Sequence, residues 1–215
     1  MTRLLLVLAC LLAPSLAHAQ ELDDRSPRVA MNLALGFGGE IVQSIDAEGS
    51  FFDTRRDFEL DASVGFDVRG ELPVLDFLVV GGMFTFLSVD TDLPGEDFER
   101  EETFAFDGYL RGRWVFEVVA DTLFVEPYVL LPLGFSMAVL PDDDGSGDDV
   151  WPGWNTGALL GAQVLHASGF GGYLEMGWRH TEVYHQRSIG SSRVDLGFAL
   201  NEFALNLGFV YAFGG

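Results

Sequence analysis

The stretch DFELDASVGFDVRG, residues 57–70, alternates apolar side chains with charged or small ones. The apolar set is Phe58, Leu60, Ala62, Val64, Phe66 and Val68, and the other set is Glu59, Asp61, Ser63, Gly65, Asp67 and Arg69. Successive side chains of a strand point to opposite faces, so this period of two predicts a β-strand with one apolar face and one charged face. The fold then depends on which face lies inside.

The same alternation recurs along the chain, which predicts an all-β protein. The other expected strands are 28–38, 77–89, 103–117, 122–138, 154–165, 171–181 and a last strand that ends at Phe213. Strand 77–89 is apolar on both faces, so its orientation cannot be read. After residue 19 no apolar run reaches the roughly 20 residues of a membrane helix.

Two strands depart from the pattern. Pro127 and Pro132 interrupt the strand at 122–138, and proline cannot donate a backbone hydrogen bond, so we expect a bulge there. In the last strand the apolar positions shift from the series ending at Leu200 to the series beginning at Phe203. That shift predicts a second bulge near Asn201 and Glu202.

The connections between these strands alternate in length. Long polar loops are expected at 39–56, 90–102, 139–153 and 182–195, and short turns near 70–76, 118–121 and 166–170. An even number of strands, with long loops at one end and short turns at the other, is typical of outer-membrane barrels. The pattern predicts an eight-stranded antiparallel up-and-down transmembrane β-barrel.

A soluble lipocalin-like barrel also has eight alternating strands, with its apolar face turned inward around a ligand. Two features favour the membrane barrel. Gly, Ala and Ser concentrate on the charged face, and small residues suit a narrow lumen. Large Phe, Leu and Trp side chains fill the apolar face almost without interruption, which suits contact with lipid. We therefore expect Phe58 to Val68 to face lipid and Glu59 to Arg69 to face the interior.

The N-terminus predicts export. The apolar run at 4–12 and the small-residue exit Ala17-His18-Ala19 are typical of a secretory signal peptide, so residues 1–19 are expected to be removed and residues 20–215 to form the barrel. The chain has 33 acidic residues against 12 cationic ones, all of them Arg. This balance argues against nucleic acid as a partner. No cofactor is expected.

The last strand carries a sharper motif. The segment NLGFVYAF at 206–213 resembles the C-terminal sorting signal of bacterial outer-membrane proteins. The matching positions are Asn206, Gly208, Tyr211 and Phe213, although two glycines follow the usual terminal Phe. In architecture the chain resembles the small barrels of the OmpA and OmpX type. The resemblance implies a bacterial outer membrane, contact with its lipid and lipopolysaccharide, recognition by the barrel-assembly machinery, and a monomer.

Charged residues on the inward face are the first candidate site. They are Glu59, Asp61, Asp67, Arg69, Asp107, Arg111, Arg113, Glu126, Tyr128, Glu175, Arg179 and Glu202. Folding the strand at 103–117 onto the next one about a turn near 119–120 sets Arg113 opposite Glu126 and Arg111 opposite Tyr128. Buried charges are costly unless they are paired, so we expect a hydrogen-bonded plug. A gated narrow pore is the alternative.

The acidic segment PDDDGSGDD at 141–149 is a weaker candidate for a metal site. Asp142, Asp144, Asp148 and Asp149 offer oxygen ligands to Ca²⁺, but the twelfth position from Asp142 is Gly153, where an EF-hand has Glu. A solvated acidic loop is the simpler interpretation.

Enzymatic residues are sparse. His166-Ala167-Ser168 matches the His-x-Ser pair of an outer-membrane lipid A deacylase, but we expect it on a periplasmic turn, away from the outer leaflet. His180 and His185 lie near the outer rim, with Glu182 nearby. We expect a non-enzymatic protein with a structural or surface-interaction role, a polar and mostly closed lumen, and acidic extracellular loops. A small-solute channel is the alternative, and a lipid-modifying enzyme ranks third.

Overall fold

The computed structural model describes residues 26–47, 53–90, 101–141, 148–189 and 192–213. All the regular elements within them are strands: β1 (Arg28–Ala47), β2 (Asp53–Leu75), β3 (Leu78–Asp90), β4 (Glu101–Arg113), β5 (Phe116–Val119), β6 (Leu123–Pro141), β7 (Asp148–His166), β8 (Phe170–Ile189) and β9 (Ser192–Ala212). None of these residues forms a helix long and apolar enough to cross a membrane.

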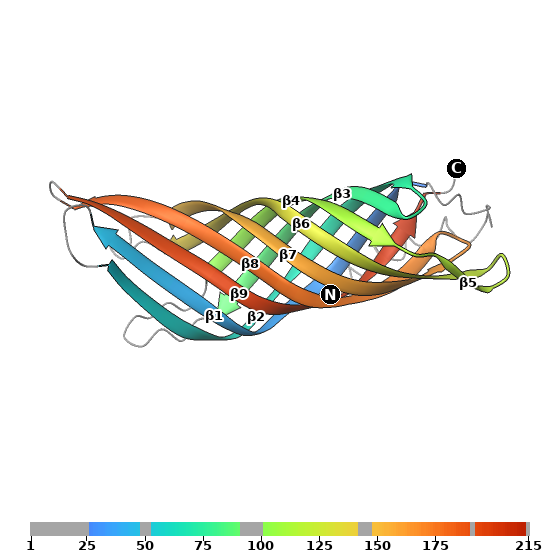
Figure 1. Ribbon diagram of the computed structural model, residues 1–215, viewed down its shortest axis with the longest axis horizontal. Helices are drawn as coiled ribbons and strands as arrows, with labels where there is room; N and C mark the ends of the chain where they lie inside the picture. The colour runs from blue at the N-terminus through green and yellow to red at the C-terminus, as the bar shows by residue number, and fades with distance from the viewer. Residues whose placement is uncertain (1–25, 48–52, 91–100, 142–147, 190–191, 214–215) are drawn as a thin grey trace, which may run out of the picture.

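The strands close into a ring. Each strand except β4 pairs antiparallel with the next one along the chain, β4 pairs with β6, and β9 pairs with β1 (Figure 1). The short β5 follows β4 after Trp114 and Val115 and pairs with the same neighbour, β6. Because β4 and β5 together take the place of one strand, the ring is that of an eight-stranded barrel. The strand expected at 103–117 is therefore interrupted between β4 and β5 rather than continuous.

The apolar face of each strand points outward. Large side chains that remain 42–57% exposed include Met31, Leu33, Phe66 and Phe106, whereas Asn32, Asp67 and Asp107 are buried. In a closed barrel every strand pairs with two neighbours, so hydrogen bonds between strands can satisfy the backbone polar groups in lipid. Strand β3, whose faces could not be assigned from sequence, turns Met83, Thr85 and Leu87 inward and Phe84 and Phe86 outward.

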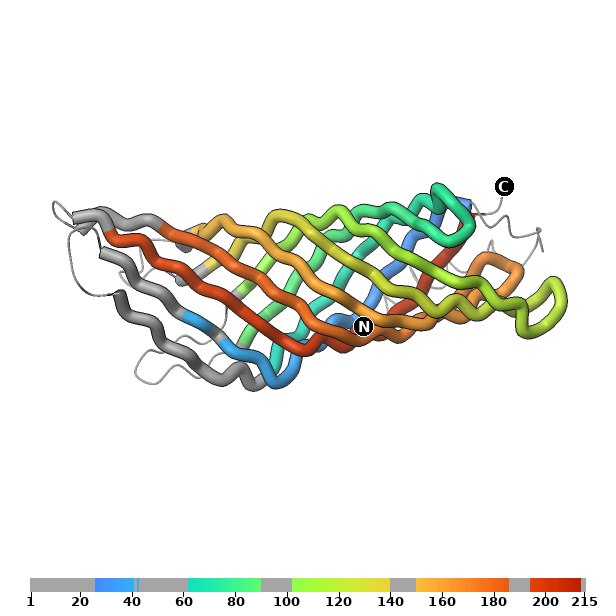
Figure 2. Tube along the Cα trace, viewed as in Figure 1, coloured from blue at the N-terminus to red at the C-terminus, as the bar shows by residue number. Residues whose placement is uncertain are grey.

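One end of the barrel carries the short turns, at 76–77, 120–122 and 167–169. The other end differs from expectation, because most of the loops expected at 39–56, 139–153 and 182–195 are strand. Strands β1, β2, β8 and β9 reach furthest there (Figure 1), and β9, drawn in red, runs along most of the length of the barrel (Figure 2). The 20 residues of β8 are about twice the length of a tilted barrel span, so this wall extends past the membrane.

The bulge expected around Pro127 and Pro132 is absent. Strand β6 keeps one continuous register with β4, and its pairing with β7 lapses only at Leu131 and Pro132 without a shift. The Pro132 carbonyl accepts a hydrogen bond of 3.0 Å from the Thr156 hydroxyl. Loss of one donor is therefore tolerated locally, without an inserted residue.

The irregularity near Glu202 lies in the neighbouring strand. Register between β1 and β9 shifts between Phe37 and Glu40, so the extra residue belongs to the Gly38–Gly39 pair of β1, where Gly38 has φ +56°. Strand β9 itself pairs with β8 without a shift. Leu200, on the same face as Glu202, points inward and packs with Val89 and Phe198. The expected bulge in β9 was thus wrong, because the lumen itself becomes apolar near this end.

Candidate functional site: the polar lumen

The structure buries ten of the twelve lumen candidates, each with at most 8% of its surface exposed. They are Asp67, Arg69, Asp107, Arg111, Arg113, Glu126, Tyr128, Glu175, Arg179 and Glu202. The side chains of the other two, Glu59 and Asp61, lie outside the described part of the chain. The buried side chains come from five strands around the ring, so they meet across the lumen rather than along one wall.

Glu126 is the centre of a cluster near the turn end. Arg28 donates to both of its carboxylate oxygens, at 2.6 Å and 3.0 Å. Arg111 Nη2 reaches Glu126 Oε2 at 3.1 Å, and Arg113 Nη1 reaches Oε1 at 3.2 Å. One carboxylate thus receives three guanidinium groups from β1 and β4. We call Arg28, Arg111, Arg113 and Glu126 the Glu126 cluster.

These contacts form in a different register from the one expected. Arg113 lies opposite Tyr128, and Arg111 lies opposite Leu130, two residues away from the expected pairing. The turn is centred later than 119–120, with Asp121 at φ 54°, and a bulge separates Glu117 from Val119. Arginine side chains are long enough to reach diagonal neighbours, so Arg113 still bonds Glu126 and the Arg111 guanidinium lies 4.5 Å from the centre of the Tyr128 ring.

Arg111 also forms an ion pair with a second carboxylate, that of Glu71. Its Nη1 lies 2.7 Å from Glu71 Oε1 and 2.9 Å from Oε2. Gln163 lies beside both groups, accepting from Arg111 at 3.4 Å and donating to Glu126 at 3.4 Å. Strands β2 and β7 are thereby joined to the Glu126 cluster.

Glu175 is the centre of a second cluster. Arg69 donates to both of its oxygens, with an Nη1–Oε2 distance of 2.9 Å. The Tyr128 hydroxyl donates to Oε2 at 2.9 Å, and the Asn206 amide donates to Oε1 at 2.7 Å. Arg69 also pairs with Asp67 at 2.8 Å. We call Asp67, Arg69, Tyr128, Glu175 and Asn206 the Glu175 cluster.

A further ion pair, between Arg179 and Glu202, lies next to the Glu175 cluster. Arg179 Nη1 lies 3.1 Å from Glu202 Oε1, and its Nη2 lies 3.4 Å from Asn206 Oδ1. The Ser63 hydroxyl donates to Glu202 Oε2 at 2.5 Å. The carboxylates of these three groups, Asp67, Glu71, Glu126, Glu175 and Glu202, therefore each have a cationic partner and hydrogen bonds, the condition under which buried charge is tolerated.

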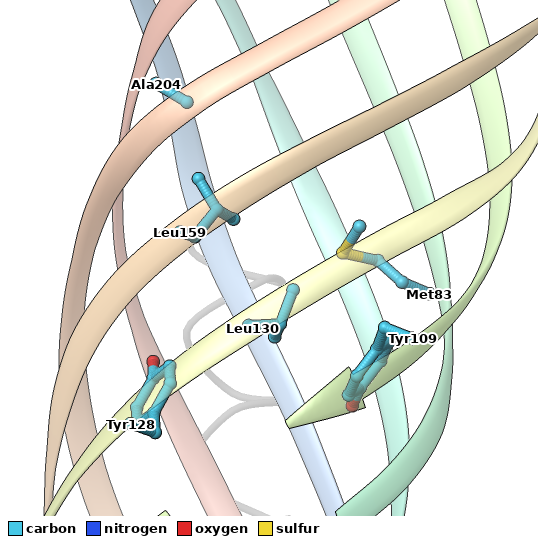
Figure 3. Packing of buried hydrophobic residues seen from close by; sticks show 6 residues of the cluster. All are labelled: Met83, Tyr109, Tyr128, Leu130, Leu159 and Ala204. Carbon is cyan, nitrogen blue, oxygen red and sulfur yellow. The ribbon is translucent and has the colours of Figure 1, made fainter. Parts of the chain in front are cut away.

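Three tyrosines of the lumen each lie opposite a glycine of the neighbouring strand. In register, Tyr109 lies opposite Gly81, Tyr128 opposite Gly161, and Tyr173 opposite Gly208. A Cβ added at Gly161 would lie 2.6 Å from Tyr128 Cε2, and one at Gly208 would lie 2.7 Å from Tyr173 Cζ. Figure 3 shows Tyr109 and Tyr128 together with other buried hydrophobic side chains of the interior, Met83, Leu130, Leu159 and Ala204. The small residues on the inner face thus make room for rings.

Several polar members of the described interior were not in the predicted lumen set, among them Arg28, Asn32, Glu71 and Gln163. Arg28 and Asn32 stand at even-numbered positions of β1, as do the other inward residues of that strand. Glu71 is the next inward position after Asp67 and Arg69 in β2. Gln163 is on the polar face of its segment. Extending each alternating run by one residue pair would have found Arg28 and Glu71.

Asp107 differs from the other buried carboxylates. Neither of its oxygens, nor Asn155 Oδ1, has a hydrogen-bond partner among the described residues. Asp107 and Asn155 line a cavity of about 10 Å³ together with Thr85, Thr103 and Thr181. That volume is about what one water molecule needs. Among the residues described, no group of three or more His, Cys, Asp or Glu is arranged to hold a metal ion.

The remaining candidates lie elsewhere. Asn206 and Gly208 face the lumen, whereas Phe213 is exposed and its ring packs edge-on against Tyr211. The calcium candidates Asp142 and Asp144, and the side chains of Asp148 and Asp149, are outside the described residues.

The histidines are also placed. His166 lies at a turn, where its Nδ1 lies 3.0 Å from both the Ser168 hydroxyl and the Ser168 backbone nitrogen. His180 packs against Trp154 and Trp178 and contacts Asn201 and Glu182. His185 stacks on Trp151.

Solved structures show what this architecture is similar to. The crystal structure of the outer membrane protein OprG from Pseudomonas aeruginosa matches with a TM-score of 0.62 at 10% identity, covering 92% of this chain and 99% of that chain. The fold is that of the small eight-stranded outer-membrane barrels. Neisserial surface protein A matches with a TM-score of 0.44 at 12% identity, over 86% of this chain and 99% of that one. The outer membrane protein AlkL, solved in lipid bilayers, matches with a TM-score of 0.44 at 14% identity, covering 89% of this chain and 92% of that chain.

These similarities are ones of fold alone. No protein-family model matches the chain, and no curated protein matches it in sequence.

Proposed function

We propose that this protein is a bacterial outer-membrane barrel that acts as a closed scaffold, with a structural or surface-interaction role. The observation that carries the proposal is the paired charge across the lumen. The Glu126 and Glu175 clusters draw residues from β1, β2, β4, β6, β8 and β9 to two shared carboxylates. An eight-stranded barrel is just wide enough for its side chains to fill, so these groups close the path.

Planar-bilayer recording tests the closed lumen. We expect no stepwise conductance from the refolded wild-type chain, because an ion would have to break several charge-assisted hydrogen bonds to pass. Arg113→Ala tests the Glu126 cluster, and Glu102→Gln is the matched control because Glu102 is exposed on the same strand. Stepwise conductance in the wild type that changes with Arg113→Ala, but not with Glu102→Gln, would show a narrow channel and overturn the proposal.

The outer membrane is proposed as the location on three grounds: the exposed apolar band, the fold shared with OprG, and the last-strand motif, which resembles the sorting signal of bacterial outer-membrane proteins. Outer-membrane lipid and lipopolysaccharide would contact that band, with the barrel a monomer. Heat modifiability provides the check: the band of the folded barrel should shift on boiling, and the protein should fractionate with the outer membrane. A chain that is soluble without detergent would contradict this location.

Biogenesis forms part of the same proposal. Residues 1–19 would be removed during export, and Asn206, Gly208, Tyr211 and Phe213 would be read by the barrel-assembly machinery. The exposed Phe213 allows a clean test, because Phe213→Ala removes no buried contact of the lumen. Slower appearance of the heat-modifiable form in cells, with unchanged refolding in detergent, is the expected result.

The proposed interaction surface is the end where β1, β2, β8 and β9 extend furthest (Figure 1). Two of the segments that connect strands at this end, 90–102 and 141–149, are strongly acidic. Loops held on a rigid scaffold are common sites of recognition. Basic or cation-bridged ligands at the cell surface are the partners that such a surface would attract.

A further inference from the structure

The described interior contains more negative than positive charge. Its buried charged residues are the five arginines Arg28, Arg69, Arg111, Arg113 and Arg179 and the six carboxylates Asp67, Glu71, Asp107, Glu126, Glu175 and Glu202. Ion pairs connect all of these residues except Asp107. One carboxylate in the described lumen is therefore left without a cation.

The surroundings of Asp107 do not neutralise it. Arg179 lines the same cavity, but its guanidinium donates to Glu202 and Asn206. Asp67 is a further acidic group nearby, and Arg69 is already shared between Asp67 and Glu175. An amide such as that of Asn155 can supply a hydrogen bond but no charge. A buried carboxylate without compensation is strongly unfavourable, and no described side chain is left to supply the missing positive charge, so a bound cation would stabilise the site.

The cavity itself indicates the ligand. Its lining combines apolar side chains such as Met83, Leu87 and Leu159 with a polar part. The polar part includes Asp107 and Asn155, whose carboxylate and amide oxygens have no hydrogen-bond partner among the described residues, and three threonines. These carboxylate, amide and hydroxyl groups all offer oxygen atoms to a cation. One carboxylate matches a single positive charge, whereas Ca²⁺ sites usually gather several carboxylates. The volume of about 10 Å³ admits a particle the size of one water molecule.

From this geometry we propose that the cavity beside Asp107 is a binding site for one small monovalent cation, with Na⁺ as the fitting ion. The ion neutralises the excess carboxylate of the lumen and fills the space between Asp107 and Asn155. The site lies on the loop-end side of the Glu126 and Glu175 clusters, because Asp107 precedes Arg111 on a strand that runs from the loop end to the turn end. The inference is independent of whether the barrel conducts.

Equilibrium dialysis with ²²Na⁺ tests this site on the refolded full barrel in a neutral detergent at pH 8. A high background of choline chloride suppresses diffuse binding to the acidic surface by screening. We expect one saturable Na⁺ per barrel in the wild type, loss of that site in Asp107→Asn, and its retention in Glu102→Gln, which removes one exposed carboxylate from the same strand.

Stability in matched salts provides a second readout. At a free Na⁺ concentration ten times the Kd, replacing choline by Na⁺ should raise the folded-to-unfolded ratio about elevenfold, and Asp107→Asn should abolish this difference. If Asp107→Asn does not fold, Thr85→Val, which removes one cavity oxygen without changing charge, should weaken Na⁺ binding. Absence of saturable binding in the wild type, or equal binding in Asp107→Asn, would overturn the proposal; a proton on Asp107 would give the first of these results.

Discussion

The two halves of the lumen handle buried charge differently. In the turn-end half, Glu126 receives three guanidinium groups, and Glu175 receives Arg69, Tyr128 and Asn206. In the loop-end half, Asp107 faces a small cavity, and the interior then becomes apolar around Val89 and Leu200. The first half is closed by its own side chains, whereas the second needs an external cation. The same chemical group is therefore expected to contribute to stability in one half and to cost stability in the other.

The sharpest test of this difference removes charge from the turn-end half. Glu126→Gln keeps the shape but removes the carboxylate that pairs with Arg28, and it weakens the ionic contacts of Arg111 and Arg113. Breaking a buried pair by removing one partner typically costs about 3–5 kcal/mol, and the hydrogen bonds show no substitute carboxylate for Arg28. Urea titration of the refolded barrel, followed by its heat-modifiable band, should show this loss, and the exposed Glu102→Gln should show almost none.

The second test targets space rather than charge. Gly161→Ala would place a Cβ 2.6 Å from Tyr128 Cε2, forcing the ring out of its position. Overpacking of this kind costs about 1–3 kcal/mol. Gly112→Ala is the control, because an added Cβ there meets nothing within 4 Å.

A double variant identifies the cause of this cost. Gly161→Ala with Tyr128→Leu should cost less than the sum of the two single changes, since the residues are in contact. Additive costs would mean that Tyr128 does not need the glycine.

Much of this arrangement follows from sequence, because alternation is a local property. A period of two assigns Asp67, Arg69 and Glu175 to one face without any knowledge of their partners. Register is not local: it depends on where the turn lies, and Asp121 and the bulge after Glu117 moved the pairing of Arg113 by two residues. Alternation alone does not reveal that Leu200 faces inward, because that would require a lumen that is partly apolar. Nor does it reveal the strand extensions in the expected loops, because charged residues stand at both odd and even positions there.

The third test replaces a buried carboxylate by an amide in the loop-end half, as Glu126→Gln does in the turn-end half. In choline chloride, without Na⁺, Asp107→Asn removes a buried charge that no described side chain neutralises. Stability should therefore stay the same or rise by about 1 kcal/mol, the low end of the cost of burying an unsatisfied polar group. Measured beside Glu126→Gln in the same titration, a loss as large as that of Glu126→Gln would show that the two halves are equally dependent on their carboxylates.

The smallest effect is expected outside both halves, at the turn between β7 and β8. His166 is exposed, and its Nδ1 accepts from the Ser168 backbone nitrogen at 3.0 Å. His166→Ala removes this local hydrogen bond, and surface changes of this kind usually stay within about 0.5 kcal/mol. The same variant examines the deacylase alternative, since the His-x-Ser pair is intact here. If His166 only shapes the turn, mass spectra of lipid A from cells that express wild type or His166→Ala will be identical, and stability will fall only slightly. Loss of an acyl chain with wild type alone would instead make His166 a catalytic residue, and the turn end would then be the functional one.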